Sequence, residues 1–186
     1  MNIFKTYVIS LRRDKERRDW MLSIKDKIGL NFDFFNAVTS EDITEVIKNA
    51  YFSHTDFHEW NIDDKAVMAT FMSHISLLNM AVKSKTNLLV IEDDIDIVNS
   101  FDWNSINFDE FDLFSLGTKF GCYAYFVSYK GAESILEHFS KTKITQAYDW
   151  ELAKINHLNF KFVDEPVFVQ TNKFVSNIAP NGYQKK

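Results

Sequence analysis

The stretch Leu88-Leu89-Val90-Ile91-Glu92-Asp93-Asp94-Ile95-Asp96 decides the fold of this chain. It begins with four consecutive apolar residues, two of them β-branched, which is typical of a strand buried on both faces of a parallel sheet. Four carboxylates follow within the next five residues. Since ligands of open α/β sheets bind beyond the carboxyl ends of the strands, the pattern puts these carboxylates where a ligand would bind.

Strand and helix patterns alternate on both sides of this stretch. Apolar and β-branched runs predict strands over 3–11, 31–38, 111–116 and 122–128, with a last apolar region over 160–169 that Pro166 interrupts. Helical periodicity predicts helices over 15–27, 64–83, 130–139 and 148–156, while 43–60 reads as part helix and part loop. The alternation predicts an α/β fold with a mostly parallel central sheet flanked by helices.

Two residues mark the ends of the helix predicted over 15–27. Asp14 is a residue type that caps helix N-termini with its side chain. Gly29 is suited to the left-handed conformation that often follows a helix. We therefore expect Asp14 to cap this helix and Gly29 to end it.

Length and composition limit the class of protein. The 186 residues fit one domain, which we expect over 1–180, with a polar tail over 181–186. Eighteen Phe can fill a bulky core, and one Cys excludes a disulfide framework. The net charge of −5 argues against a protein that binds nucleic acid through phosphate contacts.

The N-terminal apolar stretch is short and is interrupted by Lys5 and Thr6, unlike a signal peptide. No run approaches the roughly 18 apolar residues needed to span a bilayer. We expect a cytoplasmic protein. Lys141, Lys143 and the terminal Lys185-Lys186 would either contact an anionic membrane surface peripherally or be simply solvated.

The carboxylates of Glu92, Asp93 and Asp94 have two interpretations. Several carboxylates gathered at the end of a buried strand repel one another unless a cation neutralises them. Hard oxygen ligands suit Mn²⁺ or Mg²⁺, which would stabilise the charge on a departing diphosphate. The alternative is a solvated acidic turn, and the residues alone do not choose between sugar transfer, phosphate hydrolysis and nuclease chemistry.

Five blocks of the sequence carry a resemblance to a known family. The first is the opening, Tyr7-Val8-Ile9-Ser10-Leu11-Arg12-Arg13-Asp14 with Arg17-Arg18. The others are Phe34-Phe35-Asn36-Ala37-Val38, Ser73-His74 with Leu89-Val90-Ile91-Glu92-Asp93-Asp94, Ala124-Tyr125-Phe126-Val127-Ser128 with Gly131-Ala132, and Asp149-Trp150 with Gln170 and Ser176-Asn177-Ile178. In this order the blocks resemble the motifs of glycosyltransferase family 25, which holds lipooligosaccharide and procollagen galactosyltransferases.

The resemblance implies a GT-A-like fold that binds a nucleotide sugar. It implies inverting transfer of a hexose, usually galactose, from a UDP-sugar to a hydroxyl of a glycan or other acceptor, as in lipooligosaccharide biosynthesis. The resemblance assigns Glu92 and Asp94 to the metal and Asp149 to the catalytic base, although Asp149 could instead cap its helix. It also assigns donor contacts, which are Ile9, Ser10, Leu11, Arg12, Arg17, Ala37, Ser73, His74 and Asp93.

Two departures from the family pattern keep alternatives open. The segment Asp64-Lys65-Ala66-Val67-Met68-Ala69 lacks the family's usual glycine and cysteine, and Thr39 stands where a glycine usually follows Ala-Val. These changes concern the expected specificity for the acceptor. The alternatives are a non-catalytic relative that binds nucleotide or glycan, and a metal-dependent phosphoesterase.

Overall fold

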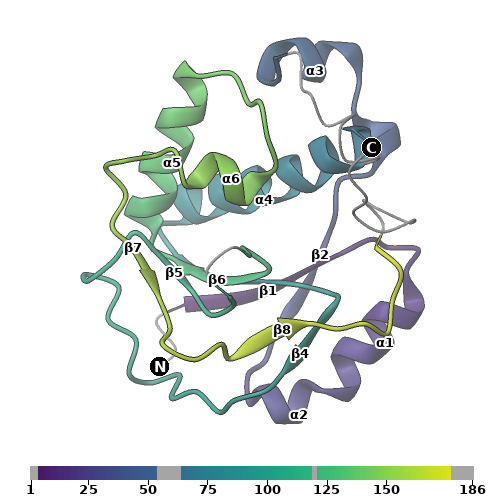
Figure 1. Cartoon of the computed structure of the whole chain (residues 1–186), viewed down its shortest axis with the longest axis vertical. Helices are drawn as coiled ribbons and strands as arrows, with labels where there is room; N and C mark the ends of the chain where they lie inside the picture. Colours follow the sequence, from purple (N-terminus) through teal and green to yellow (C-terminus); the bar gives the residue numbers. More distant parts are fainter. Residues whose placement is uncertain (1–3, 54–63, 119–120, 177–186) are drawn as a thin grey trace.

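The computed structural model describes residues 4–53, 64–118 and 121–176 (Figure 1). Six strands form the central sheet in the order β2-β1-β3-β6-β5-β7. The pairs β1–β2, β1–β3 and β5–β7 are parallel, and only β6 runs against its neighbours within this sheet. The predicted mostly parallel α/β sheet is therefore confirmed. The strands are β1 (Phe4–Ser10), β2 (Asp33–Asn36), β3 (Asn87–Glu92), β5 (Leu113–Ser115), β6 (Ala124–Val127) and β7 (Phe160–Phe162).

Strand β3 is buried on both faces, as its run of apolar residues predicts. Leu88 and Val90 pack into the core on one side of the sheet, while Leu89 and Ile91 pack into the core on the other side. All four side chains are almost fully inaccessible to solvent. Alternate side chains of a strand point to opposite faces, so this strand holds the two halves of the core together.

Helices and a small second sheet cover the two faces of the central sheet (Figure 1). One face carries α4 (Asp64–Ser84), α5 (Tyr129–Lys141) and α6 (Tyr148–Leu152), with η1 (Ser40–Asp42) and α3 (Glu45–Tyr51) beside α4. The other face carries α1 (Lys15–Ser23), α2 (Lys25–Ile28) and a two-stranded sheet of β4 (Ile95–Ile97) and β8 (Phe168–Gln170). The carboxyl ends of β1, β2 and β3 meet at one edge, where Ser10 pairs with Asn36 and Ile9 with Glu92.

The helix predicted over 15–27 is in fact two helices separated at Ile24. The Trp20 carbonyl accepts from the Ile24 N–H at 3.1 Å and also from the Ser23 hydroxyl at 2.7 Å. Ile24 leaves the helical conformation at φ −99° and ψ 2°. Gly29 ends α2 in the left-handed conformation as predicted, at φ 71°, whereas Asp14 makes no side-chain capping hydrogen bond.

Three further predictions differ from the structure. The helix expected over 148–156 stops at Leu152, because the N–H groups of Lys154 and Ile155 bond to the third residue back and not to the fourth. The apolar region over 160–169 is split between β7 and β8, which lie in different sheets. Strand β4 was not predicted, and the ambiguous stretch 43–60 contains α3, while 54–63 lie outside the described residues. The tail over 181–186 lies outside them too.

The abundant phenylalanines gather on the face that carries the small sheet. Phe126 of β6 lies at the centre of this group, and its ring meets those of Phe4, Phe101, Trp103, Phe108 and Phe114. Edge and tilted contacts of this kind add to the stabilisation from burial. Among the described helices, none has both the length and the apolar run that a bilayer-spanning segment requires.

Candidate active site

A cavity of about 300 Å³ opens at the carboxyl ends of β1 and β3. Nine of the twelve site residues predicted from the sequence line it, although they come from five separate segments of the chain. Arg12, His74 and Asp149 are not part of its lining. The nine are Ile9, Ser10, Leu11, Arg17, Ala37, Ser73, Glu92, Asp93 and Asp94.

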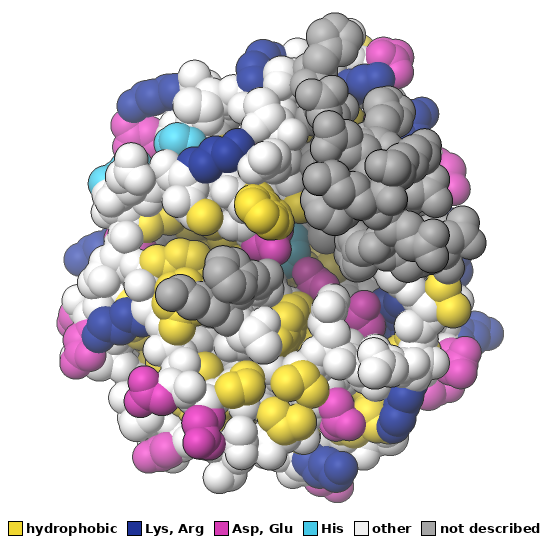
Figure 2. Space-filling model, in the orientation of Figure 1, with side chains coloured by type: hydrophobic (Ala, Val, Ile, Leu, Met, Phe, Trp, Pro, Cys, Tyr) yellow, Lys and Arg dark blue, Asp and Glu magenta, His cyan; other side chains and the backbone are white. Residues whose placement is uncertain are grey.

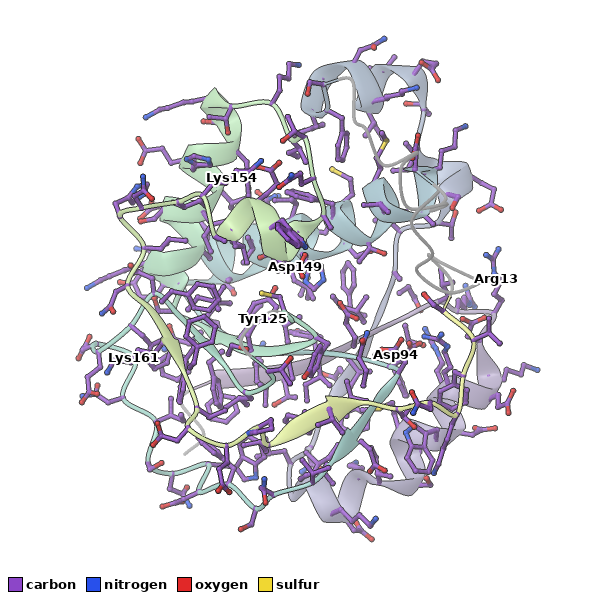
Figure 3. All side chains as sticks on the ribbon, viewed as in Figure 1. Arg13, Asp94, Tyr125, Asp149, Lys154 and Lys161 are labelled. Carbon is purple, nitrogen blue, oxygen red and sulfur yellow. The ribbon has the colours of Figure 1, made fainter. Side chains whose placement is uncertain are left out.

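The face of the molecule seen in Figure 2 has a depression near its centre. Figure 2 shows acidic side chains and a histidine at the bottom of this depression. Figure 3 labels Asp149, Tyr125 and Asp94, which all fall in the central part of the view. The charge of Asp149 acts on Glu92, and the charge of Glu92 acts on Asp94, so the predicted base and the predicted metal ligand both lie near the Glu92 carboxyl.

Arg18 holds the ends of β1 and β2 together beside the cavity. Its guanidinium donates to the Ser10 carbonyl at 3.1 Å and to the Asn36 side chain at 2.7 Å, and it lies over the Phe34 ring. A planar guanidinium can make several such contacts at once. This side chain thus stabilises the turn that carries Ile9 to Leu11, the residues predicted to contact the donor.

Ser73 of α4 holds another part of the cavity wall in place. The side chain is fully buried in the middle of α4, donates to the Ala69 carbonyl and accepts from the Val38 N–H at 2.9 Å. It therefore ties the loop after β2, including Ala37, to helix α4. The small Ala37 side chain leaves the cavity open at this point.

The three residues of the acidic motif have different partners. Asp93 is buried and receives a hydrogen bond of 2.7 Å from Arg17. The Asp94 Oδ1 atom is buried and has no hydrogen-bond partner among the described residues. Burial, and then the charge of Glu92, raise the pKa of Asp94 to about 7. An unpartnered buried carboxylate oxygen is costly, and it is the feature that a bound cation would satisfy.

Arg17 is the internal counter-charge of this motif. Its side chain is 9% exposed, bonds Asp93, lies 3.5 Å from Asp94 and donates to the Val175 carbonyl at 2.8 Å. The ring of Phe174 lies 5.4 Å from the guanidinium carbon. Because these contacts use its donors within the protein, Arg17 serves the acidic motif, and a contact with a diphosphate would have to compete with them.

Glu92 contacts His74, a buried residue in the middle of α4. The His74 Nε2 atom lies 3.4 Å from the Glu92 Oε1 atom, and Nδ1 lies 2.9 Å from the Tyr125 hydroxyl. Burial lowers the pKa of His74 to about 3, so the ring is neutral and the contact with Glu92 is a hydrogen bond and not an ion pair. Burial, and then the charges of Asp93 and Asp149, raise the pKa of Glu92 to about 8.

Asp149 lies in the first turn of α6, next to Glu92 and His74. Its charge acts on both residues, and burial raises its own pKa. The alternative role as the cap of this helix is wrong, because Ala147 occupies the N-cap position. The Asp149 carboxylate instead accepts from the N–H of Trp150 at 3.0 Å.

Two carboxylates at the end of β3 fit a divalent cation. No group of three or more His, Cys, Asp or Glu side chains converges as a metal cluster within the described ranges. A hard cation such as Mn²⁺ or Mg²⁺ nevertheless needs only one or two protein carboxylates when phosphates and waters complete its shell. Asp94, with its unpartnered oxygen, and Glu92, whose charge acts on Asp94, meet this requirement.

Some residues of the site were not predicted. Arg13 lines the cavity, whereas its neighbour Arg12 is exposed and outside the lining. Both residues lie in the turn before α1, and the sequence did not indicate which of the two would line the cavity. Further lining residues are Val38, Thr39, Ser40, Glu41, Ala66, Ala69, Thr70, Gln170 and Ser176. Asn177 and Ile178, quoted with Ser176 above, lie outside the described residues.

Comparison with known proteins identifies a family and similar solved structures. The sequence profile of glycosyltransferase family 25, described as LPS biosynthesis protein, matches residues 3–116, which is more than half of the chain. No curated protein matches the chain. Among solved structures, the chain is similar to a crystal structure of a glycosyltransferase involved in the glycosylation of the major capsid of PBCV-1. The TM-score is 0.52 at 10% identity, over 90% of this chain and 92% of that chain, so the likeness shows the fold.

Proposed function

The chain belongs to glycosyltransferase family 25, and from this premise we propose that it transfers galactose from a UDP-sugar to a hydroxyl of a glycan acceptor. The observation that carries the proposal is the cavity at the ends of β1 and β3. Its wall holds Asp94, with an unpartnered buried oxygen, and Glu92, with Asp149 alongside. The description of the family supports an acceptor in lipopolysaccharide biosynthesis.

In this proposal the nucleoside binds between the ends of β1 and β2. The backbone from Ile9 to Leu11 and the small Ala37 side chain line this part of the cavity. Arg13, which lines the cavity where Arg12 does not, takes the contact with the diphosphate, because a guanidinium binds phosphate oxygens in pairs. Arg17 then keeps the acidic motif in place.

Glu92 and Asp94 would hold the divalent cation, Mn²⁺ or Mg²⁺. When bound, the cation supplies positive charge against the diphosphate as it leaves. It also favours the ionised form of both carboxyls, whose pKa values burial holds near 8 and 7.

Asp149 is the proposed general base. The acceptor oxygen forms its new bond to the anomeric carbon as the bond from that carbon to the diphosphate breaks on the opposite side, which inverts the configuration. The proton of the acceptor hydroxyl passes to the Asp149 carboxylate, and UDP carries the electron pair of the broken bond. Because burial raises the pKa of Asp149, its carboxylate is a better base than that of an exposed aspartate.

Product analysis tests the proposal. The full chain is incubated with UDP-galactose or UDP-glucose, a divalent cation and a set of glycan acceptors, and the products are identified by mass and by proton NMR. The proposal predicts free UDP and a glycoside of inverted anomeric configuration. Release of sugar phosphate would favour a phosphoesterase, and UDP binding with no product from any donor would favour a non-catalytic relative.

A further inference from the structure

A buried row of polar side chains connects helix α6 to the acidic motif. Its members come from four elements that are distant in the sequence, namely Tyr148 of α6, Tyr125 of β6, His74 of α4 and Glu92 of β3. The first three are buried, and Glu92 is 26% exposed and lines the cavity. One end of the row thus lies beside the base Asp149, and the other end opens into the proposed donor site.

The side chains of this row contact one another through ring stacking and hydrogen bonds. The His74 ring stacks on the Tyr148 ring with centroids 4.2 Å apart and planes inclined by 5°. The Tyr125 hydroxyl lies 2.9 Å from His74 Nδ1 and 3.3 Å from the Tyr148 hydroxyl. The other ring nitrogen of His74 lies 3.4 Å from Glu92 Oε1.

Packing alone does not explain these residue types. Two hydroxyls and an imidazole are costly to bury, and apolar residues of similar volume would fill the same space without that cost. Phe71, which meets Tyr148 edge-on, shows that this core accepts a plain aromatic ring. What the polar groups add is a fixed orientation for His74, and through it for the Glu92 carboxyl.

We propose that Tyr125 and Tyr148 are positioning residues, which hold His74 so that it aims the Glu92 carboxyl into the cavity. Tyr125 bonds one nitrogen of the ring and Tyr148 fixes its plane, leaving the other nitrogen directed at Glu92. Because Tyr148 is followed by Asp149, the same contacts set the base relative to the acidic motif. The consequence for donor binding rests on the proposed function.

Two conservative variants and one control test this role. Tyr125→Phe removes the hydroxyl that bonds His74, and Tyr148→Phe keeps the stacked ring but removes its hydroxyl. Tyr123→Phe is the control, because its hydroxyl bonds Thr118 and Phe168 and does not touch His74. The side-chain ¹⁵N resonances of His74 are measured by NMR, and UDP affinity in Mg²⁺ is measured by calorimetry on the same full-length proteins.

We expect Tyr125→Phe to shift both ¹⁵N resonances of His74 and to weaken UDP affinity about tenfold, as is typical for groups that orient a metal ligand. Tyr148→Phe should shift the Nδ1 resonance and weaken affinity less, and Tyr123→Phe should change neither quantity. Unchanged resonances in Tyr125→Phe, or shifted resonances with unchanged UDP affinity, would overturn the positioning role. Shifted resonances in a protein whose wild type binds no UDP would support the link to Glu92 and overturn the proposed function instead.

Discussion

His74 and Tyr148 lie face to face across the boundary between α4 and α6, with their ring centroids 4.2 Å apart. The contact joins the helix that carries the proposed base to the helix that reaches the acidic motif. Since Asp149 directly follows Tyr148, a change in this stack would move the base and Glu92 relative to each other. Catalysis of group transfer depends on such fixed separations.

Asp149→Asn should abolish most transfer and spare donor binding. Loss of a general base costs about 10²- to 10⁴-fold in rate, whereas the Asp149 side chain does not line the cavity in which we propose that the donor binds. The measurement is kcat for transfer together with UDP affinity by calorimetry. Asp164→Asn, at an exposed position, serves as the control. A variant with a wild-type rate would remove Asp149 from the mechanism.

Trp150→Ala should weaken acceptor binding. The Trp150 side chain is 62% exposed next to the base, and an exposed aromatic face there is suited to packing against a sugar ring. We expect the acceptor KM to rise about threefold to tenfold, with the donor KM unchanged. Tyr51→Ala, an exposed aromatic on α3, is the matched control. Equal effects of the two substitutions on the acceptor KM would contradict a role for Trp150.

Gly131→Ala should destabilise the protein although alanine favours helices. Gly131 lies in the first turn of α5, and a Cβ there would clash with the Asp112 backbone carbonyl. Forcing an extra carbon into such a contact costs about 1–3 kcal/mol, more than the helix propensity returns. Thermal unfolding measures the loss against Glu133→Ala, an exposed position of the same helix. An unchanged melting temperature would show that the helix shifts freely away from Asp112.

Glu151→Gln should lower stability in a pH-dependent way. The Glu151 carboxylate accepts from the N–H groups of Thr145 and Gln146, from the Thr145 hydroxyl and from Lys154. Burial acts to raise its pKa, but these donors outweigh that effect and the pKa is lowered from 4.5. We expect a loss of about 1–2 kcal/mol at neutral pH.

The sign of the pH dependence follows from the lowered pKa. A carboxyl with a lower pKa in the folded state stabilises the protein above the unfolded value of 4.5, and this stabilisation fades as the pH falls through the folded value. The difference in melting temperature between wild type and Glu151→Gln should therefore be full at neutral pH and shrink below about 4.5. A difference that stays constant down to acid pH would contradict this account of Glu151.

Much of the fold follows from local pattern. The run Leu88 to Ile91 predicted the central strand, because complete burial requires apolar residues on both faces. Strand β4 escaped prediction, since three residues after an acidic turn carry little periodicity and pair with β8 more than 70 residues away. The break at Ile24 is a change of backbone conformation at a single residue, which periodicity does not register.

The candidate site, like the fold, could be predicted from the sequence only in part. Ile9, Ser10 and Glu92 could be grouped in advance because neighbouring parallel strands end at one edge of a sheet. The partners of His74 could not, because Tyr125 and Tyr148 meet it only through tertiary packing. A signal was nevertheless present, since a Tyr in the middle of a buried strand needs a partner for its hydroxyl.

The central claim is that the acidic motif and a divalent cation together bind the donor nucleotide. Calorimetric titration of UDP, with Mn²⁺ and with chelator, tests it in wild type, in Asp94→Asn and in Asp96→Asn. Asp96 is the control, because it belongs to the same acidic run but does not line the cavity. We predict binding that requires Mn²⁺, persists in Asp96→Asn and disappears in Asp94→Asn. Wild-type protein that binds no UDP with or without Mn²⁺, or an Asp94→Asn variant that binds as well as wild type, would contradict the claim.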